Sequence, residues 1–395
     1  MSRDAVSLSV PELLCWTERE CLDFMVKVRF QSWNTVSCPH CGTIGKHYWR
    51  PREKRWKCMG CGSTFSVTSK TVFANHKKSL REILTGALMW LNSAAGQPAL
   101  ELKRHLNTTY NTAFTLQTKL REALVRGHNV GLLNGDIEVD GAHQSGWRAD
   151  EKRGVPQGGR RKELEDADEK PDETQLTQQG RQEKKKKQKK TGAYDPEFGR
   201  KLPENRRILM TVRKRSEQKG KGACATRIAI GLTETHPVVE AMFKNFVATP
   251  ESFLNTDSSP AYTELGKQFR AHRTVEHSLA LSGPNGENNN QAEELNWRYD
   301  RAEKGTYLNI EPKYMHDYAV EIAFRSDTRR LPNGQQLERA MHYALSVGLS
   351  EYWIGFTHGN HRHEEWLLPR RQPAPSSGPA KGRNPFSNAS GRPPR

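Results

Sequence analysis

Two Cys-x-x-Cys pairs near the N-terminus constrain this chain more than any other feature of its sequence. Cys38 and Cys41 form the first pair, Cys58 and Cys61 form the second, and sixteen residues separate the two. Each pair makes a turn that can offer two thiolates to one ion, and the spacing is typical of a four-cysteine zinc site. We therefore predict a structural zinc ion here, with a redox pair as the alternative.

The residues around these cysteines predict a small β fold. The segment HYWRPREKRWKC reads as a hairpin, and GCGSTFSVTSKT continues it with another strand, so that the whole makes a zinc ribbon. His40 and His47 are expected to be bystanders rather than ligands. Cys15, Cys21 and Cys224 are expected to be small buried residues, and the cysteine pattern as a whole suits a reducing compartment.

The predicted hairpin is strongly basic. Its cations stand among Trp49 and Trp56, and they are Arg50, Arg52, Lys54, Arg55 and Lys57. The whole chain has a formal net charge of +17, which favours a polyanionic partner because each Lys or Arg on a phosphate releases condensed counterions. We predict that the hairpin contacts nucleic-acid phosphates; the alternative is a solvated hairpin whose tryptophans pack on the ribbon.

Composition divides the chain into four regions. Residues 1–75 hold the predicted ribbon, and 76–130 read as short helices that are compatible with a helix-turn-helix. We expect an α/β domain with a mixed sheet at 131–345, because strands come first and then alternate with helices. A charged insertion at 148–205 interrupts this domain and is expected to be disordered, since it has few apolar residues to bury. Residues 346–395 form a C-terminal region whose Pro-, Gly-, Ser- and Arg-rich tail is also expected to lack structure.

Acidic residues stand at the ends of predicted strands in the α/β region. Asp140 shares a strand face with Glu138 in IEVDGAH, and Asp257 ends the strand in FLNTD. Asn290 and Glu293 follow, about one helical turn apart, in NNNQAEELNW. Two aspartates and a third ligand from a helix can hold two Mg²⁺ or Mn²⁺ ions about 3.5–4 Å apart, which activate a water or 3′-hydroxyl and stabilise the leaving oxygen of a phosphodiester. The predicted ligands are Asp140, Asp257 and Glu293; taken singly, each strand-end aspartate is equally a turn former.

The order of these motifs resembles one family. CPHC, WKCMGCGSTFSVTSKTVF and NTAFTLQTKLREAL are followed by EVDGAH, LNTDSSPAY, HRTVEHS, NNNQAEELNWRYDRAEKGTY and DYAVEIAFRSDTRR. From about Cys38 to Arg330, excluding the insertion, the chain is similar to the ISXO-like insertion-sequence transposases, which are related to the Merlin elements. That resemblance implies a zinc ribbon before an RNase H-like DDE domain, whose mixed sheet is flanked by helices.

The resemblance also implies an activity and its residues. The family cleaves element ends by hydrolysis and joins them to a target by transesterification, without a covalent enzyme–DNA intermediate. By position, Asp140 and Asp257 match the first two catalytic residues, and Asn290 with Glu293 matches the third place. His277, in VEHS, also resembles a family feature, and we expect it either to contact the scissile strand or to be a hydrogen-bonded structural histidine.

The chain departs from the family where a Lys is usual ten residues after the Asn. Asp300 stands at that position, so Arg301 or Lys304 is expected to take the basic role on DNA, or activity is impaired. A register shifted by one would instead put Glu294 on the acidic place, with Arg301 on the basic one and Gln291 in place of the Asn. The sequence leaves this choice open.

The expected partners follow from the resemblance. They are double-stranded DNA, as terminal inverted repeats and target, and a second copy of the chain, since two DNA ends must be brought together. No apolar run approaches the about 20 residues that cross a membrane, so we expect no membrane partner and a cytoplasmic prokaryotic protein that associates with the nucleoid on DNA. Two alternatives stay open: a non-catalytic zinc-ribbon DNA-binding protein, domesticated or defective, and a nuclease of the same fold that cuts without joining.

Overall fold

The computed structural model describes residues 5–145, 194–195, 200–201, 206–218, 220–275, 288–308, 310–359, 362 and 364–368. Most of the predicted insertion 148–205 lies outside these residues; the described part of it is two short strands, β5 (Tyr194–Asp195) and β6 (Arg200–Lys201), which pair antiparallel. The tail from Pro369 onward and His277 also lie outside them.

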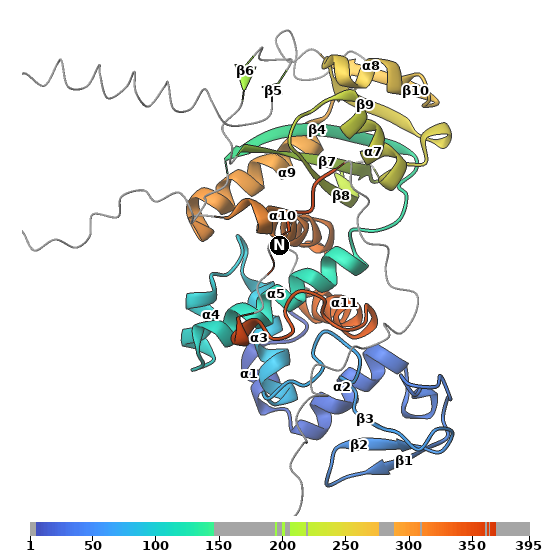
Figure 1. The fold of residues 1–395 in the computed structure, drawn as a ribbon, viewed down its shortest axis with the longest axis vertical. Helices are drawn as coiled ribbons and strands as arrows, with labels where there is room; N and C mark the ends of the chain where they lie inside the picture. The colour runs from blue at the N-terminus through green and yellow to red at the C-terminus, as the bar shows by residue number, and fades with distance from the viewer. Residues whose placement is uncertain are drawn as a thin grey trace, which may run out of the picture.

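The described residues form a helical body, with the cysteine-bearing strands at its edge, and a mixed sheet at the other end of the molecule (Figure 1). The N-terminal helices are α1 (Val10–Cys15), α2 (Glu18–Phe30), α3 (Leu80–Asn92), α4 (Ala99–His105) and α5 (Tyr110–Gly127). The C-terminal helices are α10 (Pro312–Thr328) and α11 (Asn333–Ser346). In the helical body, α11 packs on α2, α3 and α5, whereas α10 lies between α5 and the sheet.

The helices begin where the sequence offers caps. Ser79 and Glu82 form a reciprocal capping box at the start of α3, and Thr109 accepts a hydrogen bond from the backbone of Thr112 at the start of α5, as expected. The helix α5 is then buried over its C-terminal half, while the short helix α4 leaves its basic last turn exposed. The helix-turn-helix therefore stays a prediction, and in it α4 is the helix with exposed basic side chains.

The cysteine region folds as a three-stranded antiparallel sheet of β1 (His47–Arg50), β2 (Arg55–Cys58) and β3 (Thr64–Phe65). Its inner face carries Trp49, Trp56 and Phe65, which pack with one another and with Trp33 of the preceding segment. The tryptophans therefore pack on the ribbon, as the alternative interpretation of the hairpin predicted. This aromatic cluster ties the strands to the helical body.

The second sheet has the order β10-β9-β4-β7-β8 among the described residues. Its strands are β4 (Asp136–Ser145), β7 (Arg206–Arg215), β8 (Ala223–Gly231), β9 (Phe253–Asp257) and β10 (Ala271–Val275). The strands β4, β7 and β8 pair antiparallel, while β9 runs parallel to both β4 and β10. The predicted mixed sheet is thus confirmed, and β4 lies at its centre.

Helices cover both faces of this sheet. On one face, Ile137 and Val139 of β4 pack with α7 (His236–Phe246) and α8 (Pro260–Gly266). On the other face, α10 and α9 (Asn290–Arg301) pack on β7 and β8, and α9 continues as a π-helix over Ala302–Tyr307. The alternation predicted for β4 is therefore correct: its aliphatic residues enter one core, and Glu138 faces α9.

The three cysteines outside the ribbon differ in their exposure. Cys21 is buried as predicted, but the same prediction is wrong for Cys15 and Cys224, which are exposed because they lie at a helix end and on an edge strand. Within the described part of the chain, none of the helices combines the length and the apolar character needed to cross a membrane.

Candidate functional site

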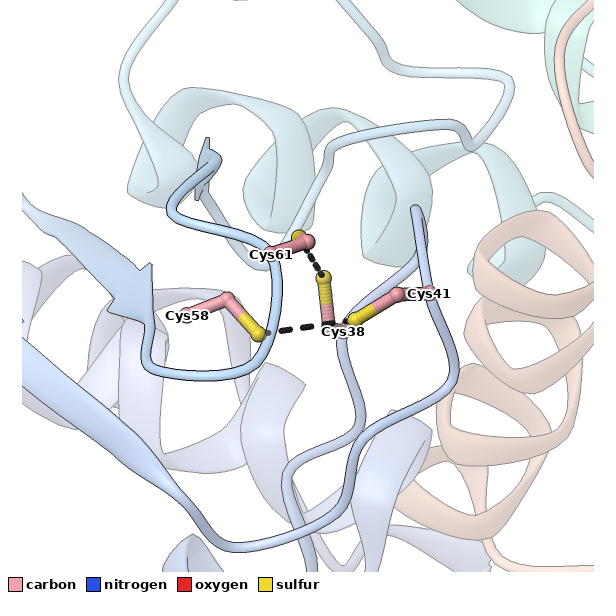
Figure 2. Close-up of side chains that lie close together, drawn as sticks. All are labelled: Cys38, Cys41, Cys58 and Cys61. Carbon is pink, nitrogen blue, oxygen red and sulfur yellow. Dashed lines mark hydrogen bonds between the residues drawn. The ribbon is translucent and has the colours of Figure 1, made fainter.

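Four cysteine side chains converge between the two turns of the ribbon (Figure 2). The Sγ atoms of Cys38 and Cys61 are 3.8 Å apart, and those of Cys41 and Cys58 are 3.6 Å apart. A tetrahedron with Zn–S bonds of about 2.3 Å has sulfur–sulfur edges of about 3.8 Å. The four thiols are therefore arranged to hold one zinc ion.

Hydrogen bonds orient these sulfurs. The backbone N–H of His40 donates to Cys38 Sγ at 3.4 Å, and that of Gly60 donates to Cys58 Sγ at 3.3 Å. The hydroxyl and backbone of Thr43 lower the pKa of the exposed Cys41 to about 6, which favours the thiolate that binds metal. These turn contacts prepare the cluster as a ligand set.

Neither histidine joins the cluster. His47 lies against the ring of Phe65, and its Nε2 atom is 2.9 Å from the backbone oxygen of Val36. Among the described residues, only the four cysteines bring three or more His, Cys, Asp or Glu ligand atoms within 4.8 Å of one another. The bystander role predicted for His40 and His47 agrees with this geometry.

The outward face of the ribbon hairpin gathers basic side chains. Arg50 pairs with Arg55 and Tyr48 with Lys57 across β1 and β2, and alternation turns all four away from the tryptophans. Arg55 and Lys57 are exposed, Arg50 is half-buried and Tyr48 is 64% exposed. Like charges directly opposite each other on a strand pair are destabilising. The repulsion between Arg50 and Arg55 would be relieved by a bound polyanion.

The turn of the hairpin extends this basic face. Arg52 and Lys54 are exposed, and Lys54 lies 3.8 Å from Glu18. Arg50 forms an ion pair with Glu53 at 2.9 Å. Both pairs are exposed, so they hold these cations only weakly against a competing phosphate.

Asp140 and Asp257 lie on neighbouring parallel strands at the centre of the second sheet. Ile137 pairs with Leu254 and Glu138 with Asn255. The paired stretch ends there, and Asp140 and Asp257 each follow two residues later on their strand. Residues far apart in the sequence thus contribute half-buried carboxylates to one edge of the sheet.

The helix α9 contacts Asp140 through an amide side chain. The Nδ2 atom of Asn296 donates to Asp140 Oδ2 at 2.7 Å, and the Asn296 Oδ1 atom accepts from the hydroxyl of Thr211 at 2.6 Å. Thr211 pairs with Asp140 across β7 and β4, and both Thr211 and Asn296 are buried. This chain of two hydrogen bonds fixes the orientation of the Asp140 carboxylate.

The candidates for the third acidic place lie on different flanks of α9. Glu294 pairs with Arg298 and reaches Arg213 of β7, and Gln291 accepts from the backbone of Ala223 on β8. Glu293 precedes Asn296 by three residues and so shares its side of the helix, away from that flank. By this spacing, Glu293 rather than Glu294 is expected on the side of α9 that meets Asp140.

Asn290, the other candidate, is the first residue of α9 and is exposed. Glu138, which shares a strand face with Asp140, serves the same helix end. Its Oε2 atom accepts from the backbone N–H groups of Gln291 at 2.6 Å and Ala292 at 3.2 Å, and Oε1 accepts from Arg215 at 2.5 Å. Burial raises the pKa of Glu138, against the lowering effect of Arg215 and the helix N–H groups. Glu138 is therefore a buried cap of α9.

The departure from the family's basic position lies at the other end of α9. Asp300 forms an ion pair with Lys304 at 2.5 Å. Arg301 is exposed, and its guanidinium lies 4.5 Å from the ring centre of Trp297, which is 56% exposed. A lysine is thus present beside Asp300, and a stacked Arg–Trp pair lies next to it on the exposed side of the helix.

The carboxylates are spaced more widely than the thiols. Because the described residues hold a tight group only at the cysteines, Asp140, Asp257 and Glu293 do not form a closed shell around one ion. A site for two ions about 3.5–4 Å apart places its ligands farther apart than a single shell does. Carboxylate oxygens are also the hard donors that Mg²⁺ and Mn²⁺ prefer, so the residues present fit such ions.

Comparison with known families connects the two sites. Residues 16–64 match the family model of the transposase zinc-ribbon domain, and residues 162–327 match that of the ISXO2-like transposase domain. The chain therefore carries a transposase zinc ribbon and an ISXO2-like transposase domain. No curated protein and no solved structure matches it.

The ISXO2-like match covers β9 and α9 of this transposase but begins after β4. The assignment of Asp140 therefore depends on the sheet register and on Asn296, and not on the family model. Asn296 and Thr211 were missed from the sequence, because an amide in a polar helix and a threonine in a strand carry no distinctive pattern. The one available signal was the spacing of three residues between Glu293 and Asn296.

Proposed function

We propose that this transposase is a metal-dependent DDE-type enzyme with an RNase H-like catalytic sheet, which cleaves DNA at element ends and joins the ends to a target. The observation that carries the proposal is that Asp140 and Asp257 stand on adjacent parallel strands, β4 and β9, beside a helix that contacts Asp140. The order of the sheet, with β4 between antiparallel β7 and parallel β9, supports the RNase H-like assignment.

Asp140, Asp257 and Glu293 would hold two Mg²⁺ or Mn²⁺ ions, with Asn290 as the alternative third residue. Such ions activate the attacking water or 3′-hydroxyl and stabilise the leaving oxygen. The protein's own contribution is to hold the ligands in place. Asn296 and Thr211 keep the Asp140 carboxylate in one orientation, and the cap from Glu138 fixes α9 against β4.

DNA would contact two basic surfaces of the chain. One is the outward face of the ribbon hairpin with its turn: Arg50, Arg52, Lys54, Arg55 and Lys57. The other is the exposed side of α9 and of the π-helix that continues it, which carries Arg301 and Lys304, with Trp297 available to stack on a base. The partner would be double-stranded DNA, and two copies of the chain would bring two ends together.

A second candidate function is a DNA-binding protein that has lost catalysis. Asp300, in the place of the family's usual lysine, is the observation that favours it. The ion pair between Asp300 and Lys304 argues against a loss of catalysis. Lys304 lies one helical turn after Asp300 and so supplies a basic group at this place.

A cleavage and strand-transfer assay on labelled element-end DNA tests the proposal. Wild type is compared with Asp140→Asn and Asp257→Asn in Mg²⁺ or Mn²⁺, and Glu240→Gln serves as the matched control, because Glu240 is a half-exposed carboxylate of α7 paired with Lys244. We expect nicked and joined products from wild type and control, and DNA binding without products from both aspartate variants.

Each other outcome of this assay identifies a different protein. Binding without cleavage by wild type would establish the non-catalytic alternative. Cleavage without joined product would establish the nuclease. Products that persist in Asp140→Asn would refute the assignment of the catalytic edge. Gel filtration with paired-end DNA tests the dimer, and one chain per complex would overturn it.

A further inference from the structure

Glu234 brings another carboxylate to the edge of the sheet where Asp140 lies. It stands in the turn between β8 and α7, more than ninety residues after Asp140. A Cβ atom built on Gly141 would lie 2.3 Å from Oε2, 2.5 Å from Cδ and 2.6 Å from Oε1 of Glu234. The carboxylate of Glu234 therefore packs on the residue that follows Asp140, in space that a side chain there would take.

Tyr262 fixes the position of this carboxylate. The tyrosine comes from α8, is 1% exposed, and its hydroxyl donates a short hydrogen bond to Oε1 of Glu234. Burial raises the pKa of Tyr262 well above its ordinary value, and so do the charges of Glu234, Asp257 and Asp140. One buried tyrosine thus lies near three carboxylates and is hydrogen-bonded to one of them.

These contacts reach the site from the face of the sheet opposite α9. Asp140 is held through Asn296 of α9, whereas Glu234 is held through Tyr262 of α8. Carboxylates gathered at one place repel one another, and a divalent cation among them removes that repulsion. Two ions also have more coordination positions than two aspartates and one helix residue fill, and water or a further carboxylate takes the rest.

We propose that Glu234 is a further ligand of the catalytic divalent ions, with Asp140 and Asp257, and that Tyr262 is the residue that positions it. The inference rests on the proposed function, since that function places divalent ions at this edge. It assigns a reason to Gly141: a larger residue there would push the Glu234 carboxylate out of place.

Mn²⁺ binding to the full-length, zinc-loaded protein tests this role without DNA or turnover. The signal of free Mn²⁺ in electron paramagnetic resonance gives the Kd for wild type, Glu234→Gln, Tyr262→Phe and Gly141→Ala, with Asp140→Asn as the reference and Glu240→Gln as the control. Loss of a residue that only supports a ligand weakens metal binding about 10- to 100-fold. We expect about 10-fold for Tyr262→Phe and at least about 100-fold for Glu234→Gln.

Gly141→Ala keeps the Glu234 carboxylate but displaces it, so it should weaken Mn²⁺ binding while the circular dichroism of the protein stays that of wild type. Unchanged Mn²⁺ binding by Glu234→Gln, beside a loss in Asp140→Asn, would overturn the role of Glu234 and leave the proposed function standing. No Mn²⁺ binding by wild type would overturn both. Equal weakening by Glu240→Gln would show a general charge effect and would also overturn the inference.

Discussion

Replacing Glu138 should destabilise the protein without removing its metal site. Its side chain is 0% exposed and accepts from Arg215 and from the N–H groups of Gln291 and Ala292. Removing one partner of a buried ion pair costs about 3–5 kcal/mol. Arg215 would still have a second ion-pair partner, Asp136, at 3.3 Å. We therefore expect Glu138→Ala to lower the free energy of unfolding by the smaller value, about 3 kcal/mol. Glu138→Gln keeps an acceptor but loses the charge, and we expect about 2 kcal/mol.

Thermal unfolding and Mn²⁺ binding, measured on the same samples, separate the two roles. For a domain of this size, about 3 kcal/mol corresponds to a fall in Tm of roughly 6–12 °C. Glu138→Ala should show that fall and still bind Mn²⁺ below its Tm. Asp140→Asn should show the reverse, a Tm near that of wild type and weakened Mn²⁺ binding. Glu138→Ala with an unchanged Tm and no Mn²⁺ binding would refute the reasoning and make Glu138 a metal ligand.

Further predictions concern zinc, DNA and pH. Chelation or Cys58→Ser should unfold the ribbon, because structural zinc supplies about 10–16 kcal/mol of apparent binding energy. The zinc content, measured by mass spectrometry, should fall in Cys58→Ser and stay unchanged in the control Cys224→Ser. Retention of zinc by Cys58→Ser would contradict the four-cysteine site. Arg55→Ala should reduce the slope of log affinity against log salt by about 1, and Lys244→Ala should leave it unchanged; equal slopes for wild type and Arg55→Ala would exclude a phosphate contact. Burial lowers the pKa of His316 from 6.5 to about 4, so the unfolded chain alone binds this proton between those values, and stability should fall by about 3 kcal/mol as pH drops through that window. His316→Gln should flatten this dependence of Tm on pH, and an unaltered slope would refute the assignment.

The sequence predicted the local elements well because each carries its own signal. The cysteine spacing predicted the ribbon cluster, and alternation in β4 separated Ile137 and Val139 from Glu138. Thr108 and Thr109 both stand before the helical repeat of α5 as possible caps, and Thr109 is the one that caps it. All these signals lie within the segment of sequence that they describe.

The site depends on contacts that the sequence does not encode locally. Asn296 meets Asp140 across more than 150 residues, and Glu234 meets Gly141 across more than 90. Glu138 shares a strand face with Asp140, but its role depends on the position of α9, which gives its carboxylate two N–H groups to cap. The register that the sequence leaves open also involves distant contacts: Glu294 pairs with Arg213 of β7, which favours Glu293 as the proposed third acidic residue.

The central claim is that divalent ions lie between Asp140 and Asp257. Anomalous diffraction from crystals of the full-length protein soaked in Mn²⁺ tests it most directly. We predict two Mn²⁺ peaks, about 3.5–4 Å apart, beside these aspartates, and neither peak in Asp140→Asn. Peaks confined to other parts of the molecule, with no density between the two aspartates, would contradict the account.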